Sequence, residues 1–350
     1  MKILLLQLKR IGDLILTTPA IAALQEKFPG AGNTLVIARE CADLLPAISG
    51  IERALVVRRN PRDLAMCFAI AREKFDYCID FTQNDRSALL TFFSRARTRI
   101  ASSRIKVDST IRARIYNQFV DARLKEMHTL DYNLAMLKPL GIEELPQLNL
   151  KIPATAHDKA RQLLQQHKID SPFIIFHPGS ARVEKFWEPA RWAEVIKRAC
   201  RHRQFNAVIT GGTWSFEKQH IDEIKERLSG EEVGAGREAS TALVVDLSGQ
   251  TDLLTLGALI AQARLLVTVD SAAMHLAAAQ GVPQVALFGP TNPFHWRPRH
   301  SPALILFGDA SVPTGEFSPK QDRRPMRQIS TEAVFNAMDS LLSAPAARLS

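Results

Sequence analysis

The stretch VTVDSAAMHLAAAQGVPQVALFGPTNP, residues 267–293, decides the fold class of this chain. An apolar run ends at Asp270, and small residues with helical spacing follow at once. A second apolar run, 284–289, ends in the turn Gly289-Pro290-Thr291. Continuous runs of Val, Ile and Leu are typical of strands that are buried on both faces of a parallel sheet. The stretch therefore predicts a strand–helix–strand unit with polar residues at its strand ends.

The same alternation extends over most of the chain and predicts an α/β protein with parallel sheets. A length of 350 residues exceeds one ordinary core, and a proline-containing segment at 141–172 breaks the rhythm. We therefore expect two doubly wound domains, at 1–152 and 153–330. A last helical pattern at 331–343, within 331–350, is expected to pack back on the N-terminal domain. Strands are expected at 2–8, 33–39, 54–59, 77–81, 173–179, 206–212, 243–249, 265–270 and 284–289, and helices at 14–28, 62–73, 155–168, 189–203, 215–228, 252–263 and 272–280.

Composition and charge narrow the function classes. Apolar residues make up 46% and charged residues 23% of the chain, and no apolar run is long enough to span a bilayer. The net charge of +9 is concentrated at 86–125, where ten basic residues face only Asp108 and Asp121. Such a segment is either a solvated basic face or a surface for a polyanion, such as anionic lipid or a phosphorylated glycolipid. No nucleic-acid-binding motif accompanies the charge, so nucleic acid is not expected as a partner.

Strand ends carry the candidate site residues, because ligands of open α/β sheets bind at the carboxyl ends of strands. In the first half, Gly12 is expected in a tight turn and Asp13 at the start of a helix. Asp13 is either the N-cap of that helix or a general base. The dinucleotide pattern G-x-G-x-x-G is absent, which argues against a dehydrogenase.

In the second half, Gly179 and Ser180 can bind an anion through their N–H groups and the Ser180 hydroxyl. Lys185 follows in a loop and is either a surface lysine or a group that neutralises a leaving phosphate. Gly211 and Gly212 indicate a close backbone approach. Glu217, beyond them, is either a ribose contact or an exposed helix charge.

The opening stretch is the strongest local signal. Ser271 and the amides after it form a helix N-terminus that suits a diphosphate, and Thr291 adds a hydroxyl from the next strand end. A Ser-His-Asp hydrolase is disfavoured, because the G-x-S-x-G elbow is missing and Ser271 and His275 lie on one helix. No second cluster supports a metal site, and His275 alone is as readily a structural hydrogen-bonding residue. The residues together indicate an enzyme with a nucleotide-diphosphate lobe and a lobe for an anionic acceptor.

Five motifs in a fixed order resemble glycosyltransferase family 9, the ADP-heptose:lipopolysaccharide heptosyltransferases, over about residues 1–340. They are KRIGDLILTTPAIAAL, HPGSARVEKFWEPARWAEVI, GG with a following Glu, SGQTDLLTLGALIAQARLLVTVDSAAMHLAAA and ALFGPTNP. The resemblance implies the GT-B fold, with two Rossmann-like domains facing a central cleft. It also implies an inverting transfer of heptose from ADP-L-glycero-D-manno-heptose to the inner core of lipopolysaccharide. The enzyme would act as a peripheral protein on the cytoplasmic face of the inner membrane.

The resemblance also implies roles for individual residues. Asp13 matches a general base, Glu217 a ribose contact, and Thr251 a position near the adenine. Lys185 is expected to stabilise the departing ADP, so no metal or other cofactor is expected. Ala272 departs from the glycine that many family members have there. The residues and the resemblance together give the expected donor contacts Gly12, Ser180, Lys185, Gly211, Gly212, Glu217, Thr251, Asp270, Ser271, Ala272, His275 and Thr291. The expected contacts to the anionic core acceptor are Arg10, Arg58, Arg112 and Arg114.

Two other functions stay open on the sequence. One is a GT-B enzyme with different nucleotide-sugar chemistry, such as an epimerase or hydrolase. The other is a non-catalytic glycolipid-binding protein, which the alanine at position 272 would favour.

Overall fold

The computed structural model describes residues 1–58, 60, 62–203, 205–229, 242–299 and 301–343. The chain divides into two compact units, Met1–Lys151 and Ile152–Ser350. The division falls one residue before the domain boundary that the sequence predicts.

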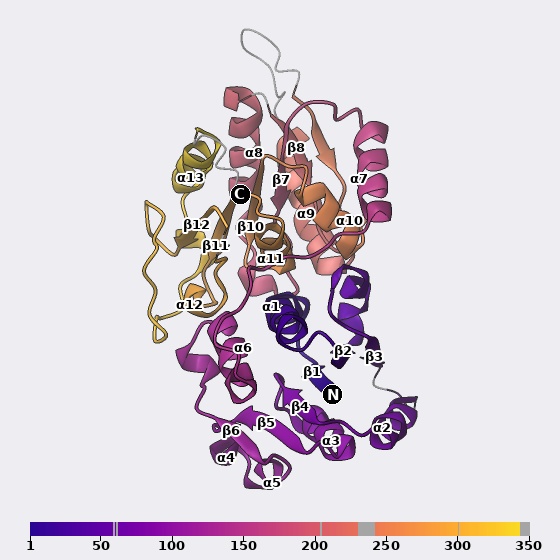
Figure 1. Cartoon of the computed structure of the whole chain (residues 1–350). Helices are drawn as coiled ribbons and strands as arrows, with labels where there is room; N and C mark the ends of the chain where they lie inside the picture. The colour runs from indigo at the N-terminus through magenta and orange to yellow at the C-terminus, as the bar shows by residue number, and fades with distance from the viewer. Residues whose placement is uncertain (59, 61, 204, 230–241, 300, 344–350) are drawn as a thin grey trace. The chain divides into compact units, whose positions relative to one another are not determined.

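Parallel strands form the sheet of the first unit, in the order β3-β2-β1-β4-β5-β6 (Figure 1). This is the strand order of a Rossmann fold, in which the direction of winding reverses between β1 and β4. The central strand β1 is apolar and buried from Ile3 to Leu6, as a strand covered on both faces must be. Its elements are β1 Lys2–Gln7, α1 Ile11–Lys27, β2 Gly32–Ala38, η1 Arg39–Ala47, β3 Arg53–Val57, α2 Arg62–Arg72, β4 Tyr77–Asp80, α3 Asp85–Ser94, β5 Thr98–Ser102, α4 Ile105–Asp108, α5 Thr110–Ala113, β6 Gln118–Val120, η2 Leu124–Glu126, α6 Thr129–Leu137 and η3 Lys138–Leu140.

The second unit repeats this plan. Its sheet has the order β12-β11-β10-β7-β8-β9, which is the same Rossmann order counted from β7, with the reversal between β7 and β10. Its elements are α7 Ala154–Gln166, β7 Phe173–His177, η4 Val183–Lys185, α8 Pro189–Arg203, β8 Asn206–Ile209, α9 Ser215–Ser229, β9 Val244–Asp246, α10 Leu253–Ile260, β10 Leu265–Val269, α11 Ala272–Ala279, β11 Gln284–Phe288, α12 Pro293–Trp296, β12 Ala303–Phe307, η5 Met326–Gln328 and α13 Thr331–Ser343. The repetition confirms the predicted α/β class with two doubly wound sheets.

Helix α13, which the sequence expects to pack back on the N-terminal domain, covers the core of the second unit with its apolar face. Its apolar residues Ala333, Val334, Ala337 and Met338 lie in the core cluster of the second unit. The segment before the helix is anchored there as well, since Trp187 Nε1 donates to Ile329 O at 3.0 Å. An apolar helix face must pack against other apolar residues, and the face of α13 packs against α8 and the strands β10–β12.

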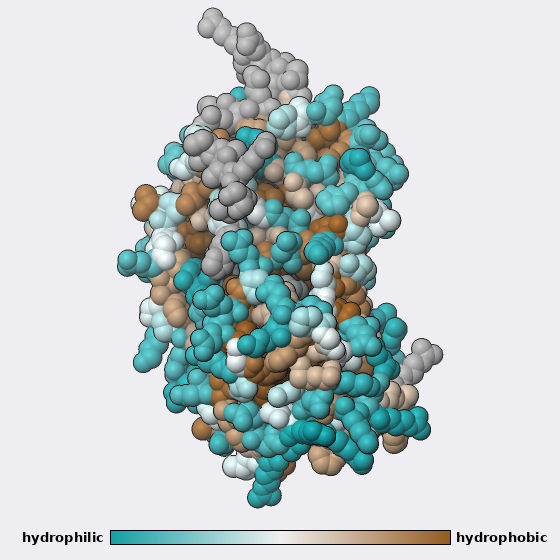
Figure 2. All heavy atoms as spheres, viewed as in Figure 1, coloured by the Kyte–Doolittle hydropathy of each residue, from teal (hydrophilic) through white to brown (hydrophobic). Residues whose placement is uncertain are grey.

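The surface seen in Figure 2 is a mixture of hydrophilic and apolar residues. Among the described residues, no helix combines the length and the apolar character that crossing a membrane requires.

Candidate functional site

The winding reversal of the second sheet brings two loops of this unit together. Strands β7 and β10 are neighbours, with His177 in register with Thr268. The chain leaves them in opposite directions, and ligands of open α/β sheets bind at the carboxyl edge where the winding reverses in this way. Thr268 Oγ1 lies 3.2 Å from His177 O and 3.1 Å from Ser271 Oγ, so the two strand ends are held together. The predicted residues Ser180, Asp270 and Ser271 follow directly after these strands.

Lys185 is held against Asp270 at this edge. Lys185 Nζ donates to Asp270 Oδ2 at 2.6 Å and to Asp270 O at 3.1 Å, and both side chains are about nine-tenths buried. Thr291 Oγ1 donates to the same carboxylate oxygen at 2.7 Å. Among the described residues, two of the three N–H bonds of the ammonium are used inside the protein, which leaves the third for a ligand. The structure therefore joins Lys185, Asp270 and Thr291, which the sequence indicated only as separate candidates.

Helix α11 begins beside this cluster with an uncapped first turn. Ser271 occupies the N-cap position, but its hydroxyl makes no capping bond and contacts Thr268. In the described part of the chain, no side chain caps the N–H groups after it, which is the arrangement that binds phosphates at helix N-termini. Ala272 is the first helical residue, so its methyl group stands where a glycine would leave the backbone bare.

His275 is buried one turn into α11. Burial lowers the pKa of this imidazole to about 4, although the negative charge of Asp270 raises it. The ring is therefore neutral at physiological pH. Its Nδ1 is buried without a hydrogen-bond partner among the described residues. A neutral ring does not neutralise a phosphate charge, so His275 is not a partner for the charge of a diphosphate.

Glu217 lies in a cradle of glycine backbone. It is the third residue of α9, and its Oε1 accepts the Gly212 N–H at 2.9 Å. A methyl group on Gly179 would stand 1.7 Å from Oε1, and one on Gly212 would stand 2.6 Å from Oε2. Burial raises the pKa of Glu217, and the Gly212 N–H opposes that rise. The glycines are therefore explained by this buried carboxylate, which is not the exposed helix charge that the sequence allowed.

Gly211 and Thr251 line the next part of the same edge. Gly211 O accepts from the Gly249 N–H at 2.9 Å, so the loop after β9 lies against the loop after β8. Thr251 follows in that loop, just before Asp252, which caps α10 by accepting from the Thr255 N–H at 2.7 Å. The second unit thus collects its predicted donor residues along one sheet edge.

Asp13 of the first unit is not an N-cap. Helix α1 starts at Ile11, and Asp13 is its third residue, with Oδ2 accepting the Arg10 N–H at 3.3 Å. Gly12 accordingly lies in the first helical turn and not in a turn before the helix. Burial raises the pKa of Asp13, while the nearby Lys9 ammonium and the Arg10 N–H oppose that rise. A buried carboxylate with a raised pKa accepts a proton readily, which is what a general base requires.

Sequence reasoning missed Lys9, a neighbour of Asp13, and Asp80, a neighbour of Lys9. Burial lowers the pKa of Lys9, and the charges of Asp13 and Asp80 oppose that fall. Lys9 Nζ also lies 5.8 Å from the centre of the Tyr132 ring. Asp80 accepts the N–H groups of Thr82 and Gln83, each at 2.8 Å, and the Tyr116 hydroxyl at 2.7 Å. Asp80 ends strand β4, so the strand-end rule applied there would have found it.

A basic pocket of about 270 Å³ lies at the carboxyl edge of the first sheet. The predicted acceptor contact Arg58 lines it, together with Arg39 and Arg86, which were not foreseen as site residues. The other predicted contacts differ in their surroundings. Arg10 and Arg114 are exposed, whereas Arg112 donates to Gln83 O at 2.8 Å and pairs with Asp85 at 3.4 Å. The pocket is lined by Leu8, Ala38, Arg39, Glu40, Val57, Arg58, Asn84 and Arg86.

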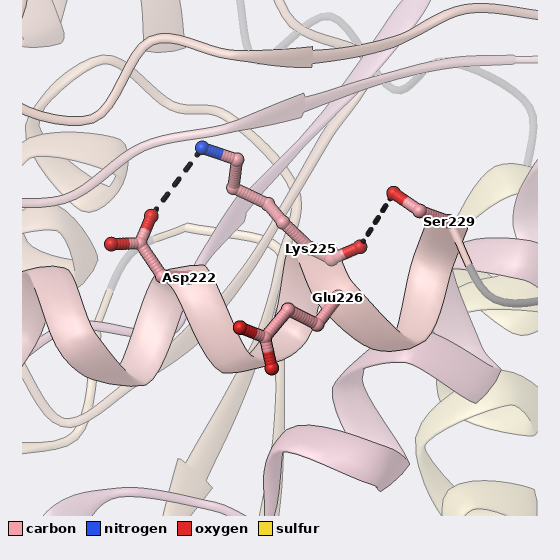
Figure 3. A pocket seen from close by; sticks show the side chains of 4 residues that line it. All are labelled: Asp222, Lys225, Glu226 and Ser229. Atoms are coloured by element: carbon pink, nitrogen blue, oxygen red, sulfur yellow. Dashed lines mark hydrogen bonds and ion pairs between the residues drawn. The ribbon is translucent and has the colours of Figure 1, made fainter.

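A larger hollow of about 600 Å³ lies along α9 and shares no residue with these clusters (Figure 3). Its lysine, Lys225, already pairs with Asp222 at 3.4 Å and with Asp246 at 2.8 Å. In the part of the chain that the structure describes, no group of three or more His, Cys, Asp or Glu side chains is arranged to hold a metal ion.

The family model of glycosyltransferase family 9 (heptosyltransferase) matches residues 64–318. The chain belongs to glycosyltransferase family 9. The lipopolysaccharide heptosyltransferase 3 of Escherichia coli is 27% identical over 345 residues, which cover 95% of this chain and 96% of that protein. The crystal structure of a family 9 glycosyltransferase from Veillonella parvula superposes with a TM-score of 0.80 at 25% identity, covering 97% of both chains. The structure of the E. coli ADP-heptose lipopolysaccharide heptosyltransferase II superposes with a TM-score of 0.75 at 21% sequence identity, covering 98% of both chains.

These likenesses confirm the predicted family and the GT-B fold class. This family 9 chain is therefore an enzyme, a glycosyltransferase, and the non-catalytic alternative is not favoured.

Proposed function

We propose that this glycosyltransferase moves heptose from ADP-L-glycero-D-manno-heptose to the inner core of lipopolysaccharide, with inversion at the anomeric carbon. The observation that carries the proposal is the Lys185–Asp270–Thr291 cluster beside the uncapped start of α11. It provides a cation and free N–H groups at the winding reversal of a Rossmann sheet, where a nucleotide diphosphate binds. The names of the relatives, lipopolysaccharide heptosyltransferases, support heptose as the transferred sugar.

The donor residues divide by the part of the nucleotide sugar that they suit. The diphosphate suits Lys185, Ser180 and the N–H groups after Ser271. Glu217, a buried acceptor held by Gly212, suits the ribose hydroxyls, and Thr251 on the neighbouring loop suits the adenine. His275, whose ring is neutral, remains a proposed donor contact away from the charge of the diphosphate. No cofactor is part of this design, because fixed positive groups stabilise the leaving diphosphate.

The chemistry is one displacement. The acceptor hydroxyl loses its proton to the Asp13 carboxylate while its oxygen bonds to the anomeric carbon of the heptose. The bond between that carbon and the phosphate oxygen breaks, and ADP leaves with the extra negative charge. The third N–H bond of Lys185 and the amides of α11 stabilise that charge. Arg10, Arg58, Arg112 and Arg114 would bind the anionic core acceptor at the cytoplasmic face of the inner membrane.

Replacement of Asp13 tests the proposal. We expect Asp13→Asn to bind ADP-heptose as the parent does, because the donor site lies in the second unit. Transfer to a core acceptor should fall by about 10²–10⁴-fold, the contribution of a general base. The matched control is Asp43→Asn, an exposed carboxylate of the same unit, which should leave both properties unchanged.

Two outcomes would contradict the proposal. Near-normal transfer by Asp13→Asn would remove Asp13 from the mechanism. Release or interconversion of the sugar when the parent enzyme meets ADP-heptose without any acceptor would indicate a hydrolase or an epimerase instead.

A further inference from the structure

Exposed apolar side chains gather on three successive connections of the first unit. Six of the twelve large apolar side chains that are exposed in the described part of the chain lie on α2, α3 and the α4–α5 segment. They are Leu64 and Phe68 on α2, Leu89 and Phe92 on α3, and Val107 and Ile111 on α4–α5. Val107 and Ile111 are 73% and 77% exposed, which is unusual for such residues.

These elements cover the same side of the first sheet. Helices α2 and α3 lie side by side (Figure 1), and their inner residues Cys67, Ile70 and Leu90 share one core cluster on the sheet. The α4–α5 segment adjoins α3, because Ala88 and Ile105 share a second cluster. The outer residues of α2 and of α3 are three or four positions apart, so each pair lies along one exposed stripe.

A basic residue continues each apolar pair. Arg72 lies four positions after Phe68, Arg86 lies three before Leu89, and Arg114 lies three after Ile111. All three are exposed, and no ion pair among the described residues involves them. Exposed Lys74, Arg95, Arg97 and Lys106 add to the same elements and their ends. Apolar stripes interleaved with unpaired cations match a surface with anionic headgroups above hydrocarbon.

We infer that the outer face of α2, α3 and α4–α5 is a docking surface for an anionic lipid bilayer. The inference rests on the proposed function and extends it, since the proposed acceptor carries a lipid and would be reached from the membrane surface. Phe68, Phe92 and Ile111 enter the boundary between headgroups and acyl chains. Arg72, with the exposed Lys74, Arg95, Arg97 and Lys106, binds the headgroup phosphates, and the first unit is thereby held at the bilayer.

Vesicle cosedimentation tests the surface without any donor or acceptor, so its result is independent of the proposed reaction. The parent chain should bind vesicles of phosphatidylglycerol and phosphatidylethanolamine, bind phosphatidylcholine vesicles at least tenfold more weakly, and lose binding as salt rises. The variant Phe68→Ser/Phe92→Ser/Ile111→Ser should lose binding to the anionic vesicles at least tenfold. Val312→Ser, a change at a 67% exposed residue of the second unit, should bind as the parent does.

Two further measurements show whether the triple variant has lost a bilayer contact, its fold or a contact between copies of the chain. Transfer to a soluble, deacylated core oligosaccharide should be unchanged in the triple variant, which also shows that it folds. The inference of a bilayer-docking surface is overturned if the triple variant binds vesicles like the parent, or if the parent binds none. It is equally overturned if the triple variant loses transfer to the soluble acceptor, or if it converts a dimeric parent to a monomer. The last result would identify a second copy of the chain as the occupant.

Discussion

Removing the Lys185 ammonium should destabilise the second unit strongly. The side chains of Lys185 and Asp270 are 11% and 9% exposed and meet at 2.6 Å. Breaking a buried ion pair by removing one partner costs about 3–5 kcal/mol, because the other charge is left uncompensated. In Lys185→Met, the Asp270 carboxylate keeps the Thr291 hydroxyl, so we take the low end, about 3 kcal/mol.

Tryptophan fluorescence during urea unfolding measures this loss in the second unit alone. The four tryptophans, Trp187, Trp192, Trp214 and Trp296, all belong to that unit, and the first two are fully buried. We take about 3 kcal/mol per M for the slope of the unfolding free energy against urea concentration, near the top of the range for small proteins. A loss of about 3 kcal/mol in stability then lowers the urea midpoint by about 1 M.

Three variants, Lys218→Met, Asp270→Asn and Lys185→Met/Asp270→Asn, make the result decisive. Lys218→Met breaks an exposed pair, with side chains 72% and 43% exposed, and should move the midpoint by only about 0.1–0.2 M, since such helix pairs contribute about 0.3–0.5 kcal/mol. Lys185→Met/Asp270→Asn removes both charges, so its loss should be clearly smaller than the sum of the two single losses. A shift in Lys185→Met no larger than that in Lys218→Met, or single losses that simply add, would refute a coupled buried pair.

Two further predictions concern the second unit. Gly179→Ala places a methyl group where Glu217 Oε1 stands, so calorimetry should show ADP binding at least tenfold weaker, whereas Gly315→Ala, which meets open space, should bind ADP normally. Unchanged affinity in Gly179→Ala would separate Glu217 from the nucleotide. Burial lowers the pKa of three histidines in this unit to about 4. As the pH falls from about 6.5 to 4, these histidines therefore bind protons in the unfolded state but not in the folded state. The free energy of unfolding should therefore fall over that range, by up to about 1.4 kcal/mol per pH unit for each histidine, and the raised pKa of Glu217 acts in the opposite direction. A urea midpoint that is constant between pH 7 and pH 5 would contradict this. The three are His177, His220 and His275.

The central, fully apolar strands are among those that the sequence revealed. Runs such as 2–8 and 265–270 must be strands buried on both faces, because nothing else in a protein of this composition covers so many consecutive apolar residues. The expected strands did not include β5, β6 and β12. In the first unit, the short strands TRIAS and QFV lie toward one end of the sheet and carry polar residues, so they have no clear apolar run. The start of α1 was placed three residues late because Arg10, at the N-cap position, is not a capping residue.

By itself, the sequence determined the fold class, the two-unit plan and which residue types end the strands, since these depend on local apolar runs and turn chemistry. The tertiary structure decided which strand ends meet. Lys185 reaches Asp270 across 85 positions of the chain because β7 and β10 are adjacent in the sheet. Glu217 fills the space that Gly179 and Gly212 leave, and Lys9 approaches Asp80 because β1 and β4 are neighbours. Strand order follows from the packing of whole units, so the local sequence around a charged residue does not reveal which residue it pairs with.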